Sequence, residues 1–269
     1  MSAERLVVDA HTHAFPDALA SRAIAHLERR ANVHAALDGS AGALVASMDR
    51  AGIARSIVCS VATGTAQFEP ILRWCAAIAS PRLIPFPSVH PAARDPAGEV
   101  RRVAEAGFRG VKLHPEYQDF HVDDAALEPL YRALEECGLV ALFHAGHDIG
   151  FPDSDRAAPA RFLSVHRAFP RLALVASHLG GFRRWSEVAE HLLGSAIWLD
   201  TSYTLGHIPA PLLGEILHGH RPDRLLFGSD SPWVDQSAAL AGVRGLGLTP
   251  ELEERILGGN ARELLGLAG

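Results

Sequence analysis

The stretch Val7-Val8-Asp9-Ala10-His11-Thr12-His13 joins a short apolar run to two histidines two positions apart. The apolar run predicts a β-strand over residues 5–9 that continues into a loop. Because side chains alternate along a strand, Asp9, His11 and His13 are expected to point the same way. Two imidazoles on one face of a strand can bind one metal ion. A lone pair of this kind also occurs by chance on solvated strand edges, so its meaning depends on the rest of the chain.

Composition is that of an ordinary soluble enzyme. The 269 residues are 48% hydrophobic and 21% charged, with a formal net charge of −6, which argues against a nucleic-acid partner. No apolar run reaches the roughly 18 residues that span a bilayer, and the first residues carry no secretion signal. We therefore expect a cytoplasmic protein without a membrane partner. Cys59, Cys75 and Cys137 are scattered, and each is expected to be a reduced, small apolar residue.

Apolar runs alternate with amphipathic segments along the whole chain. The predicted strands are residues 5–9, 56–62, 83–89, 110–114, 140–144, 172–178, 196–201 and 224–230. The predicted helices are residues 17–30, 42–51, 69–79, 95–106, 124–137, 156–169, 182–193, 209–218, 237–246, 250–257 and 260–267. Eight strands separated by helices predict a (β/α)8 barrel, also called a TIM barrel, formed by one domain over residues 1–269.

Two further points concern this fold. A doubly wound sheet is the alternative, but no glycine-rich G-x-G-x-x-G turn follows the first strand. Residues 14–52 form a long insertion after the first strand, with two helices of their own. Because this insertion connects a strand to the next helix of the barrel, we expect it at the catalytic face.

Histidine and aspartate recur at the carboxyl ends of the predicted strands, which meet at one face of a barrel. These residues are His11 and His13, then Lys112 and His114, then His144, His178 and Asp230. Imidazole and carboxylate are the ligands of Zn²⁺ and similar divalent ions. Any one of them could be a satisfied core residue, but their shared position indicates a metal site.

Lys112 is the only lysine among 25 lysine and arginine residues. An arginine cannot lose its proton in a protein, whereas a lysine can, so a single lysine indicates chemistry that a guanidinium cannot perform. The alternative is one residual surface lysine. Its position near the end of a predicted strand favours a role in the site.

These motifs, from D-A-H-T-H to G-S-D-S-P-W and the late G-N-A-R, resemble those of the amidohydrolase superfamily over essentially the whole chain. The similarity is greatest to the group that includes aminocarboxymuconate-semialdehyde decarboxylase and related metal-dependent hydrolases. The resemblance implies a distorted (β/α)8 barrel with a metal centre. It implies that His11, His13, His144 and Asp230 are metal ligands, and that His178 is a catalytic acid/base or orients the water.

The chemistry of these residue types agrees with that division. A catalytic metal needs three or four protein ligands and one open position. Asp230 can bind the metal and also accept the proton of an attacking water, so it is expected to be catalytic as well. His178 can hydrogen-bond the same water or the oxyanion, the role in which imidazole commonly serves as an acid/base. Asp9 is expected to support the ligands as a neighbouring partner.

One divalent ion is expected, with zinc preferred to manganese and other ions. The alternative is a binuclear site bridged by a carboxylated Lys112, as in other members of the superfamily. With one metal, Lys112 and His114 are expected to bind a carboxylate or phenolate of the substrate. Tyr117, Arg183, Trp185 and Trp233 lie in adjacent loops and are expected either to line the pocket or to pack the loops.

The predicted function is hydrolysis of a C–N or C–O bond in a small carbonyl substrate by metal-activated water. Non-oxidative decarboxylation of a small unsaturated or aromatic acid is the alternative that uses the same residues. A different class of function, a metal-binding barrel that has lost activity and acts as a regulator, has no need of both His178 and Asp230. The expected partner is a small anionic substrate, and a homodimer is left open.

Overall fold

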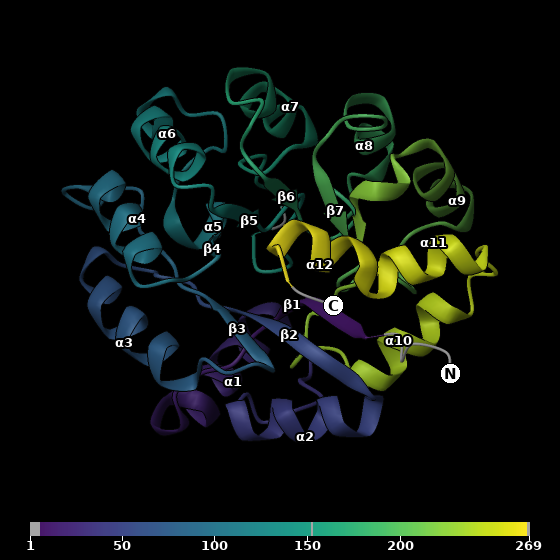
Figure 1. The fold of residues 1–269 in the computed structure, drawn as a ribbon, viewed down its shortest axis with the longest axis horizontal. Helices are drawn as coiled ribbons and strands as arrows, with labels where there is room; N and C mark the ends of the chain where they lie inside the picture. The colour runs from purple at the N-terminus through teal and green to yellow at the C-terminus, as the bar shows by residue number, and fades with distance from the viewer. Residues whose placement is uncertain (1–5, 152, 268–269) are drawn as a thin grey trace.

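A computed structural model describes residues 6–151 and 153–267 of the chain. Parallel strands form an inner wall, and helices surround it as an outer ring (Figure 1). The strands are β1 Val7–Thr12, β2 Ile53–Cys59, β3 Leu83–Phe86, β4 Gly110–Leu113, β5 Val140–Phe143, β6 Leu174–Ala176, β7 Trp198–Asp200 and β8 Leu225–Leu226. This is the predicted (β/α)8 barrel.

The wall consists of two parallel groups of strands, β1-β2-β3 and β4-β5-β6-β7-β8. Few backbone hydrogen bonds join the groups: Lys112 N donates to Pro87 O (2.9 Å) on one side, and on the other Ala10 N donates to Phe227 O (2.8 Å) and Asp230 N to His11 O (2.9 Å). Pro85 and Pro87 have no N–H, so β3 cannot extend a continuous ladder towards β4. The prolines explain why β3 ends at Phe86 rather than at the predicted residue 89.

The helices of the outer ring follow the strands in turn. They are α2 Ala41–Ala51, α3 Phe68–Ile78, α4 Pro96–Glu105, α6 Glu128–Glu136, α7 Pro159–Ala168, α8 Trp185–His191, α9 Ala210–Gly219 and α10 Gln236–Arg244. Shorter pieces are α5 Pro115–Gln118, α11 Pro250–Glu254, the π-helix η4 Arg255–Gly259, α12 Asn260–Leu265 and the 3-10 turns η1 Thr65–Gln67, η2 Ala125–Leu127 and η3 Pro222–Arg224.

The apolar core has two layers, as burial on both faces of a parallel sheet requires. The larger layer lies between the strands and the outer helices. The smaller layer fills the barrel and includes Val8, Ala10, Leu142 and Trp198, with Leu265 of α12 at its end. Asn260 Nδ2 donates to Leu225 O at the start of β8 (2.7 Å), so α12 covers the amino ends of the strands.

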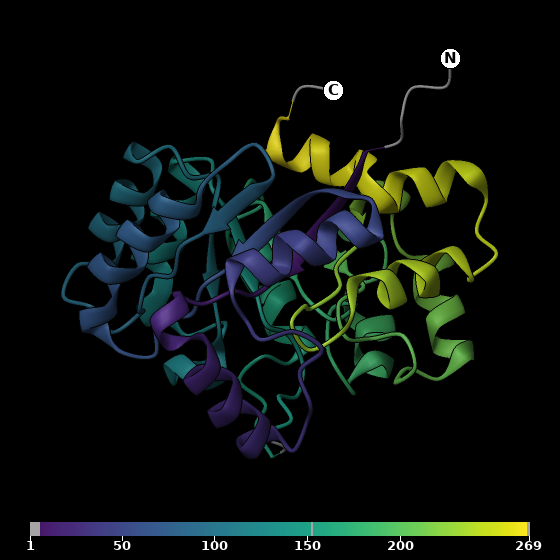
Figure 2. The same ribbon diagram turned by 90° about the horizontal axis from the view of Figure 1, so that it is seen from below.

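The insertion after β1 divides into two parts with different positions. Its second helix, α2, packs on β2 and α10 as part of the outer ring. Its first helix, α1 Asp17–Ala31, lies at the opposite end of the barrel from α12; Figure 2 shows α1 in purple below the wall and α12 in yellow above it. Because α12 covers the amino ends, α1 lies at the carboxyl ends, as predicted for the insertion.

The predicted boundaries are wrong in several places for local reasons. β1 runs to Thr12 instead of ending at Asp9, and the predicted start at Arg5 lies outside the described residues. β8 has two residues because the chain turns after Leu226 to donate from Phe227 N to Ile256 O (2.8 Å). α8 begins at Trp185 instead of residue 182, because Arg183 has a left-handed backbone (φ 58°) that a helix cannot contain.

Candidate metal centre

An irregularity in β1 turns both histidines of the His-x-His pair into the barrel. Val8 and Ala10 pack in the barrel interior, so Asp9 points outward. The pairing of β1 with β2 shifts register between Asp9 and Thr12, and this bulge lets His11 follow Ala10 on the inner face. Regular alternation would have placed His11 outside the barrel.

The expectation that Asp9 shares a face with the two histidines is therefore wrong. Its carboxylate accepts hydrogen bonds from Ser229 Oγ (2.6 Å) and Gln236 Nε2 (2.8 Å), which lie after β8 and at the start of α10. It also accepts from the backbone N–H of His11 (3.2 Å) but touches neither imidazole ring. Burial raises the pKa of Asp9 to about 6. Asp9 thus fixes the backbone under the site.

His11, His13 and Asp230 form a compact group in which one ligand atom of each lies within 4.8 Å of the others. The two Nε2 atoms are 3.2 Å apart. Asp230 Oδ1 lies 3.5 Å from His11 Nε2 and 3.3 Å from His13 Nε2. Two imidazoles and one carboxylate are a common donor set for a divalent ion in an enzyme.

The other ring nitrogens show which way the lone pairs point. His13 Nδ1 lies 3.0 Å from the carbonyl oxygen of Cys59, and His11 Nδ1 lies 3.2 Å from Asp200 Oδ2. Both oxygens only accept, so in the neutral rings each Nδ1 carries the hydrogen and each Nε2 is bare. Two bare nitrogens and a carboxylate then face one another, and a cation is the group that satisfies all three.

Asp200 and Ser202 hold this arrangement, and neither residue was singled out from the sequence. Ser202 Oγ lies 3.0 Å from both His11 Nδ1 and His178 Nδ1 and donates to Asp200. Asp200 Oδ1 also accepts from the backbone N–H of His178 (3.2 Å). The segment L-D-T-S at the end of the seventh predicted strand carried the signal, since it places an acid and a hydroxyl at the same barrel face.

His178 and His144 form a second contact beside the first group. His178 Nε2 lies 3.0 Å from His144 Nδ1. The opposite nitrogens face carbonyl oxygens: His178 Nδ1 is 2.9 Å from Ser202 O, and His144 Nε2 is 3.2 Å from His147 O. By the same reasoning both inner nitrogens are bare in neutral rings, so this pair needs a shared proton or a cation.

His144 also belongs to a group with His114 and Asp148, whose ligand atoms lie within 4.8 Å of one another. The rings of His114 and His144 are stacked, with centroids 4.4 Å apart and planes 11° from parallel. Asp148 Oδ2 lies 3.5 Å from His114 Nε2. The structure therefore brings three of the four predicted ligands together and gives His144 contacts with both His178 and this neighbouring group.

Lys112 is buried at the floor of the barrel, with 1% of its surface exposed. Its Nζ lies 3.1 Å from His11 Nε2, where the ammonium can donate to the bare nitrogen. Burial lowers the pKa of Lys112. The lone lysine thus lies inside the site, as predicted from its place in the sequence, and not on the surface.

Burial and neighbouring charges favour neutral imidazoles and an ionised carboxylate here. Burial, together with the charge of Lys112, lowers the pKa of His11 to about 4. Burial and the neighbouring imidazoles lower the pKa of His144 well below its usual range. Burial alone would raise the pKa of Asp230, but the close contact with His13 and the nearby His11 and His178 outweigh burial and lower it. Neutral imidazoles and carboxylates are the forms that bind metals.

Strained backbone concentrates at these strand ends. His178 and Asp230 have left-handed backbones, with φ of 59° and 64°, as do Leu179 and Tyr203. Non-glycine residues adopt such angles at a cost, and sites of this kind often carry function. The turn at Asp230 also lets its N–H donate to His11 O (2.9 Å), which joins the two ends of the wall.

The site opens into a cavity of about 680 Å³. Its floor includes all the predicted ligands, His178, Lys112 and His114, and its walls include Tyr117 and Trp233. Two other predicted wall residues are elsewhere. Arg183 is exposed beside Phe182, and Trp185 is buried in the outer core, where its Nε1 donates to His178 O (3.1 Å).

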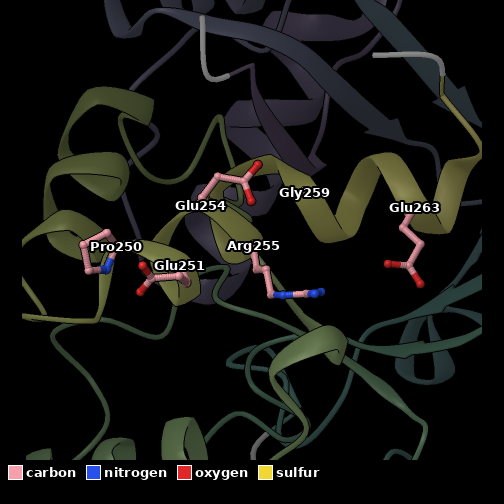
Figure 3. Close-up of a pocket in the computed structure, with 6 residues that line it drawn as sticks. All are labelled: Pro250, Glu251, Glu254, Arg255, Gly259 and Glu263. Atoms are coloured by element: carbon pink, nitrogen blue, oxygen red, sulfur yellow. The ribbon is translucent and has the colours of Figure 1, made fainter. Parts of the chain in front are cut away.

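A second hollow of about 400 Å³ lies on the outside of the molecule at α11 and α12 (Figure 3). It is lined by Glu251, Glu254, Arg255 and Glu263, with Pro250 and Gly259. Glu254 accepts from Arg262 (2.8 Å), so its charge is compensated. This hollow lies at the amino ends of the strands, away from the histidines.

A parallel α/β barrel with histidines and aspartates at the carboxyl ends of its strands is the architecture of a large class of enzymes. The chain belongs to the amidohydrolase family, because the sequence model of that family matches residues 8–267. This match confirms the resemblance drawn from the motifs and identifies the chain as an enzyme of the superfamily. No curated protein matches the sequence.

Solved structures with the same fold include three informative examples. An uncharacterised TIM-barrel protein from Bordetella bronchiseptica has a TM-score of 0.79 at 22% identity, over 97% of this chain and 98% of that chain. 5-Carboxyvanillate decarboxylase from Sphingomonas paucimobilis has a TM-score of 0.73 at 17% identity, over 98% and 100% of the two chains.

The third example is 5-carboxyvanillate decarboxylase from Novosphingobium aromaticivorans with bound manganese and a nitrobenzoic acid. It has a TM-score of 0.72 at 16% identity, over 97% of both chains. At these identities the likenesses confirm the barrel fold.

Among the described residues, no helix combines the length and the apolar character that a membrane span requires.

Proposed function

We propose that this enzyme uses one divalent metal ion to cleave a bond at the carbonyl or carboxyl carbon of a small anionic substrate. His11, His13 and Asp230 would hold the ion, with His144 as the fourth ligand. The observation that carries the proposal is the convergence of bare imidazole nitrogens and a carboxylate within 4.8 Å on the floor of one cavity. Zinc is the first choice, and the manganese bound to a related barrel supports manganese as the second.

When bound, the ion would polarise the substrate carbonyl and lower the pKa of water. The protein's own groups then move the protons. Asp230 is ionised and faces the group, so its free oxygen can accept a proton from water. His178 lies beside this group through its contact with His144, and Ser202 fixes its ring. We assign His178 as the acid that gives the leaving group the proton it shares with His144, and the proton taken up by Asp230 then replaces the one that His178 has lost.

Lys112 and His114 would bind the anionic group of the substrate. Lys112 Nζ lies at the floor next to His11, and His114 lines the same cavity with one buried ring nitrogen that has no partner. An ammonium, and an imidazole nitrogen that carries the ring hydrogen, can both donate to a carboxylate or phenolate. Tyr117, whose ring packs edge-on against His114 (4.6 Å between centroids), and Trp233 would flank the substrate.

Hydrolysis of a C–N or C–O bond is the first reaction we propose, because an ionised Asp230 and a neighbouring histidine provide a base and an acid. Decarboxylation is the second candidate, because solved barrels of the same fold are decarboxylases of aromatic acids. In that reaction Lys112 would hold the substrate, and His178 would donate a proton to the carbon that loses CO₂.

The test has two stages. Purified protein is analysed for metal content, and the expected result is about one divalent ion per chain. The loaded protein is then offered a panel of lactones, amides and aromatic acids, with acid release and CO₂ release measured separately. Hydrolysis without CO₂ supports the first candidate, and CO₂ release supports the second. A protein that binds no divalent ion, even on titration, would overturn the proposal; a loaded protein without turnover would favour the regulatory alternative.

A further inference from the structure

Helix α1 carries two apolar stripes, and other parts of the chain cover only one of them. Ala20 and Ile24 are its buried residues. Leu19, Ala23 and Leu27 lie on an adjacent side of the helix at spacings of four residues, and all three line the cavity. Leu19 is 42% exposed and is the only large apolar side chain with that exposure in residues 6–151 and 153–267.

Helix α3 repeats this arrangement at the cavity. Phe68 and Cys75 are its buried residues. Pro70, Ile71 and Trp74 follow one another at helical spacing on another side, and they line the same cavity as α1. Two helices thus present an apolar stripe to one space, although an apolar stripe normally packs against a partner.

This apolar space is continuous with the polar floor. The lining of one cavity includes Leu19 and Trp74 near the rim together with Lys112 and Asp230 below. The volume of about 680 Å³ has room for roughly twenty water-sized groups, since each water occupies about 30 Å³ of liquid. A single-ring acid at the floor would leave most of the apolar walls uncovered.

We propose that the substrate carries an apolar arm of several carbon atoms, which lies between α1 and α3 while its anionic head reaches Lys112. The inference rests on the proposed function for the position of the head. The arm would bury Leu27, Ile71 and Trp74, which explains why both helices keep apolar residues at a solvent-facing mouth. Chain length at this end of the substrate is then the main determinant of specificity.

The test uses a series of benzoates with straight 4-alkyl chains, from methyl to hexyl, and binding to the metal-loaded protein is measured by calorimetry. Burial of each added methylene should tighten binding roughly threefold, so hexyl, with five more methylenes, should bind about 240-fold tighter than methyl. Leu27→Asp and Ile71→Asp should remove most of this length dependence. The matched controls are Ser21→Asp and Ala76→Asp, which change exposed residues on the opposite sides of α1 and α3 and should preserve it.

Equal binding of the methyl and hexyl compounds, or no binding of the hexyl compound, would overturn the proposal of an apolar arm. So would loss of length dependence in the controls as much as in the cavity variants. The ratio between two benzoates is measured in one protein, so it stays informative even if that protein binds no metal and the proposed function fails. If Leu27→Asp instead changes the sedimentation of the protein from dimer to monomer, a second copy of the chain covers the stripes and the proposal is wrong.

Discussion

The two groups of histidine and aspartate side chains in the cavity differ in the hydrogen bonds that hold their rings. In the group of His11, His13 and Asp230, each ring is anchored at Nδ1, one by Asp200 and one by the carbonyl of Cys59. In the group of His114, His144 and Asp148, the buried Nδ1 of His114 has no hydrogen-bond partner. Hydrogen bonds at Nδ1 therefore hold both rings of the first group, whereas one buried ring nitrogen of the second group has no hydrogen bond.

Ring orientation separates the groups as well. The planes of His11 and His13 are inclined by 58°, so their in-plane lone pairs can meet at one ion. The rings of His114 and His144 are stacked and nearly parallel, so their lone pairs run side by side and do not converge. We infer that the first group is built for a metal ion and the second for a flat or anionic substrate, with His144 between them.

The largest effect is expected from breaking the first group. Asp230→Asn removes the one carboxylate among the bare nitrogens, so the protein should lose its divalent ion and at least roughly 10³-fold of its turnover. The paired variant is Asp148→Asn in the second group, which should retain the ion. Metal content after dialysis, measured by mass spectrometry, distinguishes the two. If Asp148→Asn loses the ion and Asp230→Asn keeps it, the assignment of the groups is reversed.

A smaller effect is expected at His178, which touches His144 but is absent from both groups. His178→Asn should keep most of the metal and lower kcat by about 10²-fold, the scale of general acid–base catalysis. His144→Asn, in contrast, should lose metal first. Equal loss of metal in both variants would make His178 a ligand, and the site would then be binuclear or rearranged.

The anchors behind the rings give a further test. Asp200→Asn leaves every ligand in place but weakens the group that orients His11, so metal affinity should fall roughly 10- to 100-fold. Thr204→Val is a suitable control, because Thr204 is buried nearby and its hydroxyl donates to Ser202 O, not to the ring of His11 or of His178. Metal titration monitored by calorimetry gives both affinities. Unchanged affinity in Asp200→Asn would mean that packing alone orients His11.

The strand and helix order was predictable because continuous apolar runs alternate with amphipathic segments throughout the chain. The positions of His144, His178 and Asp230 at strand ends followed from that order. The orientation of Asp9 could not be predicted in this way. It is set by a bulge in β1, and the bulge arises from the pairing of β1 with β2. Nothing in the local sequence marks that register.

The contacts that the anchoring residues make could not be predicted, for a physical reason. Asp200 contacts His11 across 189 positions, and Asp9 contacts Gln236 across 227. Such contacts depend on closure of the barrel, which brings the first and last strands together. The left-handed turns at His178 and Asp230 are strained conformations that residue preferences disfavour, so only the folded chain reveals them.

The smallest effect, and the one that tests how the two groups cooperate, concerns Lys112. Its ammonium lies 3.1 Å from His11 Nε2, the nitrogen that we propose as a metal ligand, and lines the cavity. A compact charge fits there and a forked guanidinium does not. Lys112→Arg and Lys112→Met should fold and keep the ion but raise KM about tenfold or more. Met removes the charged partner of a buried anion, and Arg keeps the charge but cannot place it where the ammonium lies. KM is measured with any substrate that the panel identifies, and thermal unfolding checks the fold. Full activity in Lys112→Arg would end this assignment.

A different result would establish Lys112 as a carboxylated bridge between two ions. In that case the native chain carries the added mass of one CO₂, and Lys112→Ala loses the ion. A small carboxylate then restores the ion to Lys112→Ala, and bicarbonate does not.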